Sequence, residues 1–179
     1  MNKEETLEVY DEIYLEQPKE ARKLLMKLNY KCDHLLLQKI AHTYLLESID
    51  LEENNKQLSR RKLRTANDYI VRAANITWLC SNVLWTFGQI KLSYGQNDSA
   101  IFCFHEIIRI GMRGIGRDSC NNDRDDILAQ INDSKFELYR CYYDINPGLS
   151  KRYLAMYLKG LQKGIYTIFE PYEEYLVKH

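Results

Sequence analysis

Residues 81–110 read SNVLWTFGQIKLSYGQNDSAIFCFHEIIRI, and this stretch decides the fold class. On each side of the Gly95-Gln96-Asn97-Asp98 segment, apolar residues recur at spacings of three and four. Such spacing places them on one face of an α-helix, and the segment between them has the composition of a turn. The stretch therefore predicts two antiparallel helices joined by a short connection.

The same spacing covers most of the chain, whereas the sustained alternation that indicates strands is almost absent. Further helices are expected around residues 7–14, 18–28, 36–50, 66–74, 127–142 and 153–161. Residues 51–64 fit either a loop or the exposed start of a helix. Residues 111–126 contain three glycines and no apolar period, so they are expected to form a long loop. The prediction is an all-α protein of about eight or nine helices.

The composition is that of one folded domain covering residues 1–179. The chain has 45% hydrophobic and 28% charged residues, with only 8 glycines and 3 prolines, which excludes disorder and argues against a many-stranded β-sandwich. Lysine plus arginine equals aspartate plus glutamate at 25 each, so no global charge indicates a nucleic-acid or membrane partner. The five cysteines are irregularly spaced and no secretory signal opens the sequence, so a cytoplasmic location is expected.

Four residues of the first stretch carry a resemblance to a known family. Gly88, Gly95, Ala100 and Phe104 follow one another at intervals of seven, five and four residues. These are the small and aromatic places of a tetratricopeptide repeat, which residues 81–110 resemble. A second hairpin, residues 127–163, fits the register less well because Tyr153 stands where a small residue is expected. The resemblance implies antiparallel hairpins stacked as a small α-solenoid, ending in an aromatic segment at residues 165–179.

Motifs for catalysis or metal binding are incomplete. His105-Glu106 begins like a zinc-protease helix, but Arg109 stands where the second histidine ligand is required. Cys32 and His34, like Cys103 and His105, are two residues apart, and side chains at that spacing point in different directions on a helix. We therefore expect no enzyme activity, no metal, no cofactor and no small-molecule substrate.

Charge is unevenly distributed along the chain. Residues 1–20 hold seven acidic against two basic residues, a net charge of −5, and residues 56–72 hold six basic residues against one acidic, a net charge of +5. The two blocks could attract each other within the fold, face partners, or form solvated helix faces. The basic block lacks the interleaved aromatic residues that stack on bases, so nucleic-acid binding is not expected.

A second acidic region coincides with many of the 14 tyrosines. Tyrosine serves both half-buried helix seams and protein-binding surfaces, and tyrosines beside the aspartate-rich loop would form one interaction face of aromatic anchors surrounded by carboxylates. The candidate partner-binding residues are Asp118, Asp123, Asp125, Asp126, Tyr139, Tyr143, Glu170, Tyr172, Glu173 and Glu174.

These features favour a non-catalytic protein-binding module. In size, tyrosine content and acidic patches, the chain resembles the immunity proteins that protect bacteria from toxins of contact-dependent growth inhibition. That resemblance implies a toxin domain as partner. Many such toxins are nucleases, and the carboxylates would face the basic cleft of such an enzyme. The alternative is a tetratricopeptide-type adaptor or secretion chaperone holding a peptide in its groove, and the third reading is an RNA-binding regulator using residues 56–72.

Overall fold

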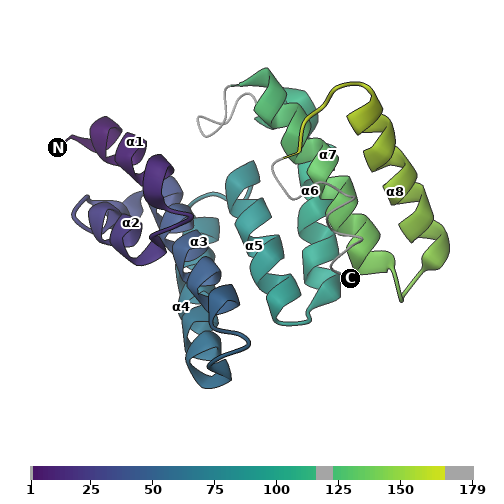
Figure 1. Ribbon diagram of the computed structural model, residues 1–179. Helices are drawn as coiled ribbons and strands as arrows, with labels where there is room; N and C mark the ends of the chain where they lie inside the picture. Colours follow the sequence, from purple (N-terminus) through teal and green to yellow (C-terminus); the bar gives the residue numbers. More distant parts are fainter. Residues whose placement is uncertain (1, 116–122, 168–179) are drawn as a thin grey trace. The chain divides into compact units, whose positions relative to one another are not determined.

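The chain folds as two compact units, Met1–Gly95 and Gln96–His179. The computed structural model describes residues 2–115 and 123–167 (Figure 1). Within these residues every regular element is helical, eight α-helices and one short 3₁₀-helix, which confirms the all-α prediction. That residues 1–179 form one domain stays a prediction.

The first unit contains five α-helices. They are α1 (Lys3–Ile13), α2 (Pro18–Leu25), α3 (His34–Asp50), α4 (Lys56–Ile76) and α5 (Ser81–Ser93), with the 3₁₀-helix η1 (Tyr30–Cys32) before α3. Helix α1 packs against α2, and α3 packs against α2, α4 and α5. Helix α3 is therefore the centre of this unit.

Side-chain caps or a proline mark the beginning of several of these helices. Asn2 and Glu5 form a capping box at α1, and Pro18 occupies the first turn of α2, where its missing N–H costs nothing. The Asn55 side chain accepts a hydrogen bond from the Leu58 N–H at 3.1 Å, so α4 begins at Lys56. The uncertain segment 51–64 is thus a short turn followed by helix.

The core of the first unit lies where α1, α2 and α3 meet. Tyr10, Ala21, Leu25, Leu36 and Ile40 are all buried there. The apolar spacing in the sequence predicts these positions correctly, because each lies on the stripe that faces a neighbouring helix.

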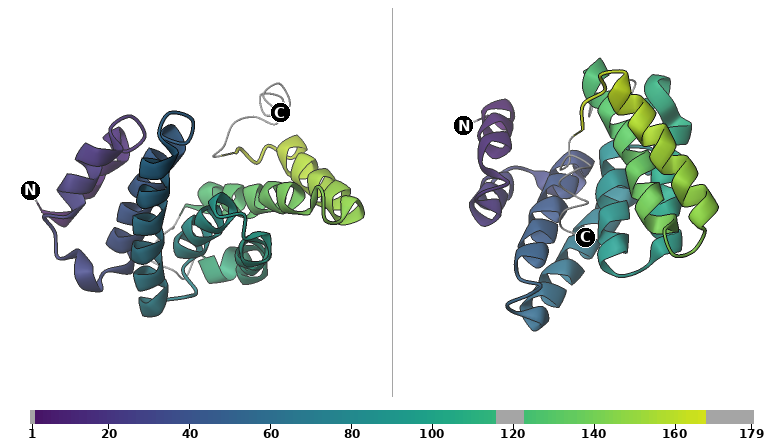
Figure 2. Two further views of the ribbon diagram at one scale, coloured as in Figure 1. Left: turned by 90° about the horizontal axis from the view of Figure 1, so that it is seen from below. Right: turned by 45° about the vertical axis from the view of Figure 1, so that its right-hand side comes forward.

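The second unit contains α6 (Asn97–Ile115), α7 (Arg124–Tyr142) and α8 (Pro147–Gln162). Helix α7 packs against both α6 and α8 (Figure 2). Helices α7 and α8 cover most of the predicted hairpin at residues 127–163 and pack against each other.

The predicted loop at residues 111–126 is too long at both ends. Gly111 adopts a left-handed φ of 61° and kinks α6, but the helical segment continues to Ile115, which is fully buried. At the other end the Asp123 side chain caps α7, which begins at Arg124. Glycine lowers helix stability but does not always end a helix, and Gly111 and Gly114 both lie within α6. Residues 116–122 of the predicted loop lie outside the described residues.

Candidate partner-binding surfaces

Three of the predicted aspartates meet at the beginning of α7. The Asp123 carboxylate accepts hydrogen bonds from the backbone N–H groups of Asp125 at 2.7 Å and Asp126 at 3.4 Å. Asp125 is exposed, and half-buried Asp126 accepts a hydrogen bond from the Tyr166 hydroxyl. Negative charge at this end is also favourable for the helix itself, because the N-terminus carries a partial positive charge.

The two predicted tyrosines of α7 have different environments. Tyr139 is only 9% exposed and packs against Phe136 and Tyr143, with ring centroids 5.6 and 6.0 Å apart. Tyr143 is 61% exposed, one residue beyond the end of α7. Tyr139 therefore stabilises the unit and offers little surface to a partner.

The aspartates and Tyr143 do not form one compact patch. They lie at opposite ends of α7, about 27 Å apart at a rise of 1.5 Å per residue. The sequence suggested one face because it showed neither which residues α8 covers nor where α7 begins. The remaining predicted residues lie outside the described part of the chain: Asp118, Glu170, Tyr172, Glu173 and Glu174.

A half-buried aromatic cluster joins the three helices of the second unit. The rings of Tyr142 and Tyr153 are stacked with centroids 5.8 Å apart, and His105 Nε2 lies 3.3 Å from the Tyr142 hydroxyl. Burial lowers the pKa of His105, although nearby Glu106 acts in the opposite direction. Burial raises the pKa of the neighbouring Cys141 thiol to about 12, which leaves it without nucleophilic character at neutral pH. This arrangement serves packing.

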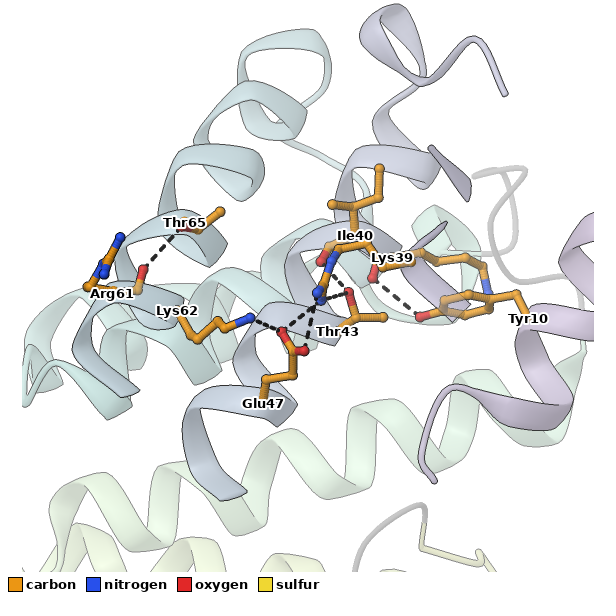
Figure 3. A network of polar contacts seen from close by, with 9 residues as sticks. Tyr10, Lys39, Ile40, Thr43, Glu47, Arg61, Lys62 and Thr65 are labelled. Carbon is orange, nitrogen blue, oxygen red and sulfur yellow. Dashed lines mark hydrogen bonds and ion pairs between the residues drawn. The ribbon is translucent and has the colours of Figure 1, made fainter. Parts of the chain in front are cut away.

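A buried charged cluster holds α2, α3 and α4 together, and we call it the Arg22–Glu47 cluster. Arg22 Nη1 lies 2.9 Å from Glu47 Oε2 and 3.4 Å from Thr43 Oγ1, while Lys62 Nζ lies 2.8 Å from Glu47 Oε2. Figure 3 shows Lys62 and Thr43 on either side of the Glu47 carboxylate. The Arg22 guanidinium also lies over the Tyr44 ring, 3.8 Å from its centroid.

The Arg22–Glu47 cluster keeps its carboxylate ionised. Burial alone raises the pKa of Glu47, but hydrogen bonds from Arg22 and Lys62 outweigh burial and hold that pKa below its usual value. The side chains of Arg22 and Glu47 are 7% and 13% exposed. The cluster is therefore a structural connection that positions α4.

Helix α4 presents a row of cations on its outer side, which we call the α4 basic face. It consists of Lys56, Arg60, Arg61 and Arg64. All four side chains are exposed, and in the described part of the chain none of them forms an ion pair. Among the basic residues at positions 56–64, only Lys62 points inward, where it pairs with the Glu47 carboxylate of α3.

The acidic and basic blocks do not neutralise each other in the fold. Within the described residues, Asp11 pairs with Lys39 and Glu20 with Lys23, and no ion pair joins residues 2–20 to residues 56–72. Of the three possibilities that the sequence left open, mutual attraction within the monomer is thus not observed.

Metal binding and membrane insertion find no support among the residues described. No group of three or more histidine, cysteine, aspartate or glutamate side chains there could hold a metal ion. None of the described helices combines the length and apolarity needed to cross a membrane.

Comparison with known proteins identified no similar protein. No protein-family model matches the chain, and no curated protein or solved structure is significantly similar to it. Function is therefore argued from the surfaces alone.

Proposed function

We propose that this chain is a non-catalytic protein-binding module, and that it acts as a bacterial immunity protein which neutralises a cognate toxin domain. The observation that supports this proposal is the acidic end of α7, where Asp123, Asp125 and Asp126 gather within one helical turn. A basic toxin cleft is the complementary surface, and complementary charge accelerates association.

One partner can reach both ends of α7. A standard protein interface covers roughly 800 Å² on each side, a patch about 30 Å across, and this matches the length of α7. In this arrangement the aspartates steer the encounter, while exposed Tyr143 supplies an aromatic contact that slows dissociation.

A stacked, tetratricopeptide-like arrangement of hairpins belongs to the same proposal. Gly95 adopts a left-handed φ of 68° immediately after Tyr94, the C-cap of α5, as expected for the glycine that ends the first helix of a repeat. Ala100 and Phe104 are fully buried, as the packing positions of the second helix should be. These observations also support the alternative, an adaptor or chaperone that binds a peptide in a groove.

If the reading frame directly upstream of this gene encodes a toxin domain, binding to that domain tests the proposal. Co-expression should restore growth of cells that produce the toxin domain. Asp125→Asn should slow association about fivefold at 50 mM salt and leave it nearly unchanged at 500 mM, because salt screens exposed charges. Asp125 suits this test because it is exposed and, unlike Asp123, does not cap α7.

Asp68→Asn on α4 is the matched control, since Asp68 is also an exposed helical aspartate. It should leave the association rate unchanged. Failure of co-expression to protect would contradict the immunity function, and equal association rates for D125N and D68N would remove the acidic end of α7 from the interface.

A further inference from the structure

The α4 basic face is unfavourable for an isolated helix. Lys56, Arg60 and Arg64 follow each other at intervals of four residues, so their side chains are neighbours in one row, with Arg61 beside it. Like charges at this spacing repel. Lys56 also lies in the first turn, where the helix dipole disfavours a cation. The face therefore gains stability from an anionic surface laid along it.

Helix α1 carries a matching row of carboxylates. Glu4, Glu8 and Glu12 are exposed at the same interval of four residues, and within the described residues they take part in no ion pair. The two rows have equal length and opposite charge. Contact between the two rows would therefore offset the like-charge repulsion within both of them.

Within one molecule the two rows occupy separate parts of the first unit. Helix α1 contacts α2 and also α3, where Asp11 pairs with Lys39, and α3 packs against α4, so α3 lies between α1 and α4 in the order of packing. No ion pair between the rows is present in the part of the chain that the structure describes.

We propose that the α4 basic face binds the α1 row of a second copy of this chain. The charges of the two blocks, −5 for residues 1–20 and +5 for residues 56–72, are equal in size, and the whole chain has no net charge. Copies are therefore not repelled at long range, and their opposite faces attract at short range. RNA is the competing anion, but residues 56–64 contain no aromatic side chain on which bases could stack.

The association is weak and salt-sensitive, because exposed ion pairs contribute little individually. We expect a dissociation constant on the order of 10⁻⁴ M at 50 mM salt, and at least a tenfold weaker association at 500 mM, where charges are screened within a few ångströms. Because the two faces differ, the contact is heterologous. It forms a dimer if two copies make both contacts with each other, and otherwise rings or short chains.

Sedimentation velocity on the full chain, from 10 to 500 µM at both salt concentrations, measures this association. The α4 variant R60E/R61E/R64E and the α1 variant E4K/E8K/E12K should each remain monomeric at 50 mM salt. An equimolar mixture of the two should associate again, because each then offers the charge that the other lacks. The control variant K151E/R152E/K159E reverses three exposed cations of α8 and should associate like the wild type.

Three results would overturn the proposal. They are a monomeric wild type at 500 µM and low salt, unchanged association of both reversed variants, and a mixture that stays monomeric although circular dichroism shows both variants folded. If either variant fails to fold, the salt dependence of the wild type decides. Retention of a 20-nucleotide poly(U) RNA by a monomeric wild type, lost in the α4 variant and kept in the α1 variant, would assign the face to nucleic acid instead.

Discussion

The first unit joins α2, α3 and α4 through charged side chains, whereas the second unit joins α7 and α8 through amide and hydroxyl groups at a close helix approach. In the first, Arg22 and Lys62 both contact the Glu47 carboxylate. In the second, Asn132 Nδ2 donates to the Tyr157 carbonyl at 3.1 Å, and Ser150 Oγ donates to the Tyr139 carbonyl at 3.0 Å. The charged connection is thus sensitive to loss of one partner, and the close approach is sensitive to added volume.

The largest effect is expected from Arg22→Ala. It leaves the largely buried Glu47 carboxylate with Lys62 as its remaining cation, and the free energy of unfolding should fall by about 3 kcal/mol. Urea denaturation at pH 7 measures this loss.

The double variant R22M/E47M separates charge from packing. With both charges of the pair replaced by apolar side chains, it should be more stable than Arg22→Ala. A double variant less stable than the single one would show that the cluster is intrinsically stabilising, contrary to this interpretation.

The next effect is expected from Gly160→Ala in α8. A Cβ atom at Gly160 would lie 2.1 Å from Asn132 Oδ1, and Asn132 is fully buried, so its amide must shift and weaken its hydrogen bonds. We expect a loss of about 2 kcal/mol after allowing for the higher helix propensity of alanine. Thermal and urea unfolding both report it.

Gly148→Ala is the matched control in the same helix, because its Cβ would meet Asn146 Oδ1 at an ordinary 3.5 Å. It should not destabilise the protein. N132A/G160A should lose less than the sum of its two single variants, since removing the amide opens the space that the new methyl group requires. Additive losses would place the strain elsewhere.

The sequence predicted helices well because a stripe of apolar side chains is a local pattern. It predicted surfaces less well, and α7 shows the reason. Gln130, Asn132, Asp133 and Glu137 are polar yet buried, because α7 packs between two helices and is covered on several sides. A polar residue in a pattern indicates exposure only where the helix has one covered face.

The charged surfaces show the same limit. The basic block at residues 56–72 was visible in the sequence, but the inward direction of Lys62 and the outward direction of Arg60 and Arg64 depend on where α3 supplies Glu47. No spacing within α4 contains that information. The carboxylate that pairs with Lys62 belongs to Glu47 in α3, so the residues of the α4 basic face could be identified only from the fold.

A smaller effect is expected from acidification, through His42 in the first unit. Burial, with a smaller contribution from the Lys39 charge, lowers the pKa of His42 to about 4, and its ring lies against Tyr14. Below pH 6.5 the unfolded chain binds a proton that the folded chain does not, so stability falls as pH falls until about pH 4. Between pH 7 and pH 5.5 the loss should be about 1 kcal/mol.

His42→Gln should flatten this part of the stability profile. His105 in the second unit also has a lowered pKa, so a weaker slope remains in the variant. Urea denaturation at pH 7, 6.25 and 5.5 compares the two proteins. A profile unchanged by H42Q would mean that His42 is protonated as easily in the folded chain as in the unfolded one.

The smallest effect is expected from Lys62→Met. This variant shows how much each of the two cations of the Arg22–Glu47 cluster contributes to the free energy of unfolding. Lys62 Nζ is as close to the Glu47 carboxylate as Arg22 is, 2.8 Å against 2.9 Å, but its side chain is 25% exposed compared with 7% for Arg22. Water already competes for the ammonium group, and Glu47 keeps the Arg22 guanidinium, so the free energy of unfolding should fall by only about 0.5 kcal/mol. If urea denaturation showed a loss equal to that of Arg22→Ala, the three charges would act as one unit, and burial would not explain the difference between the two cations.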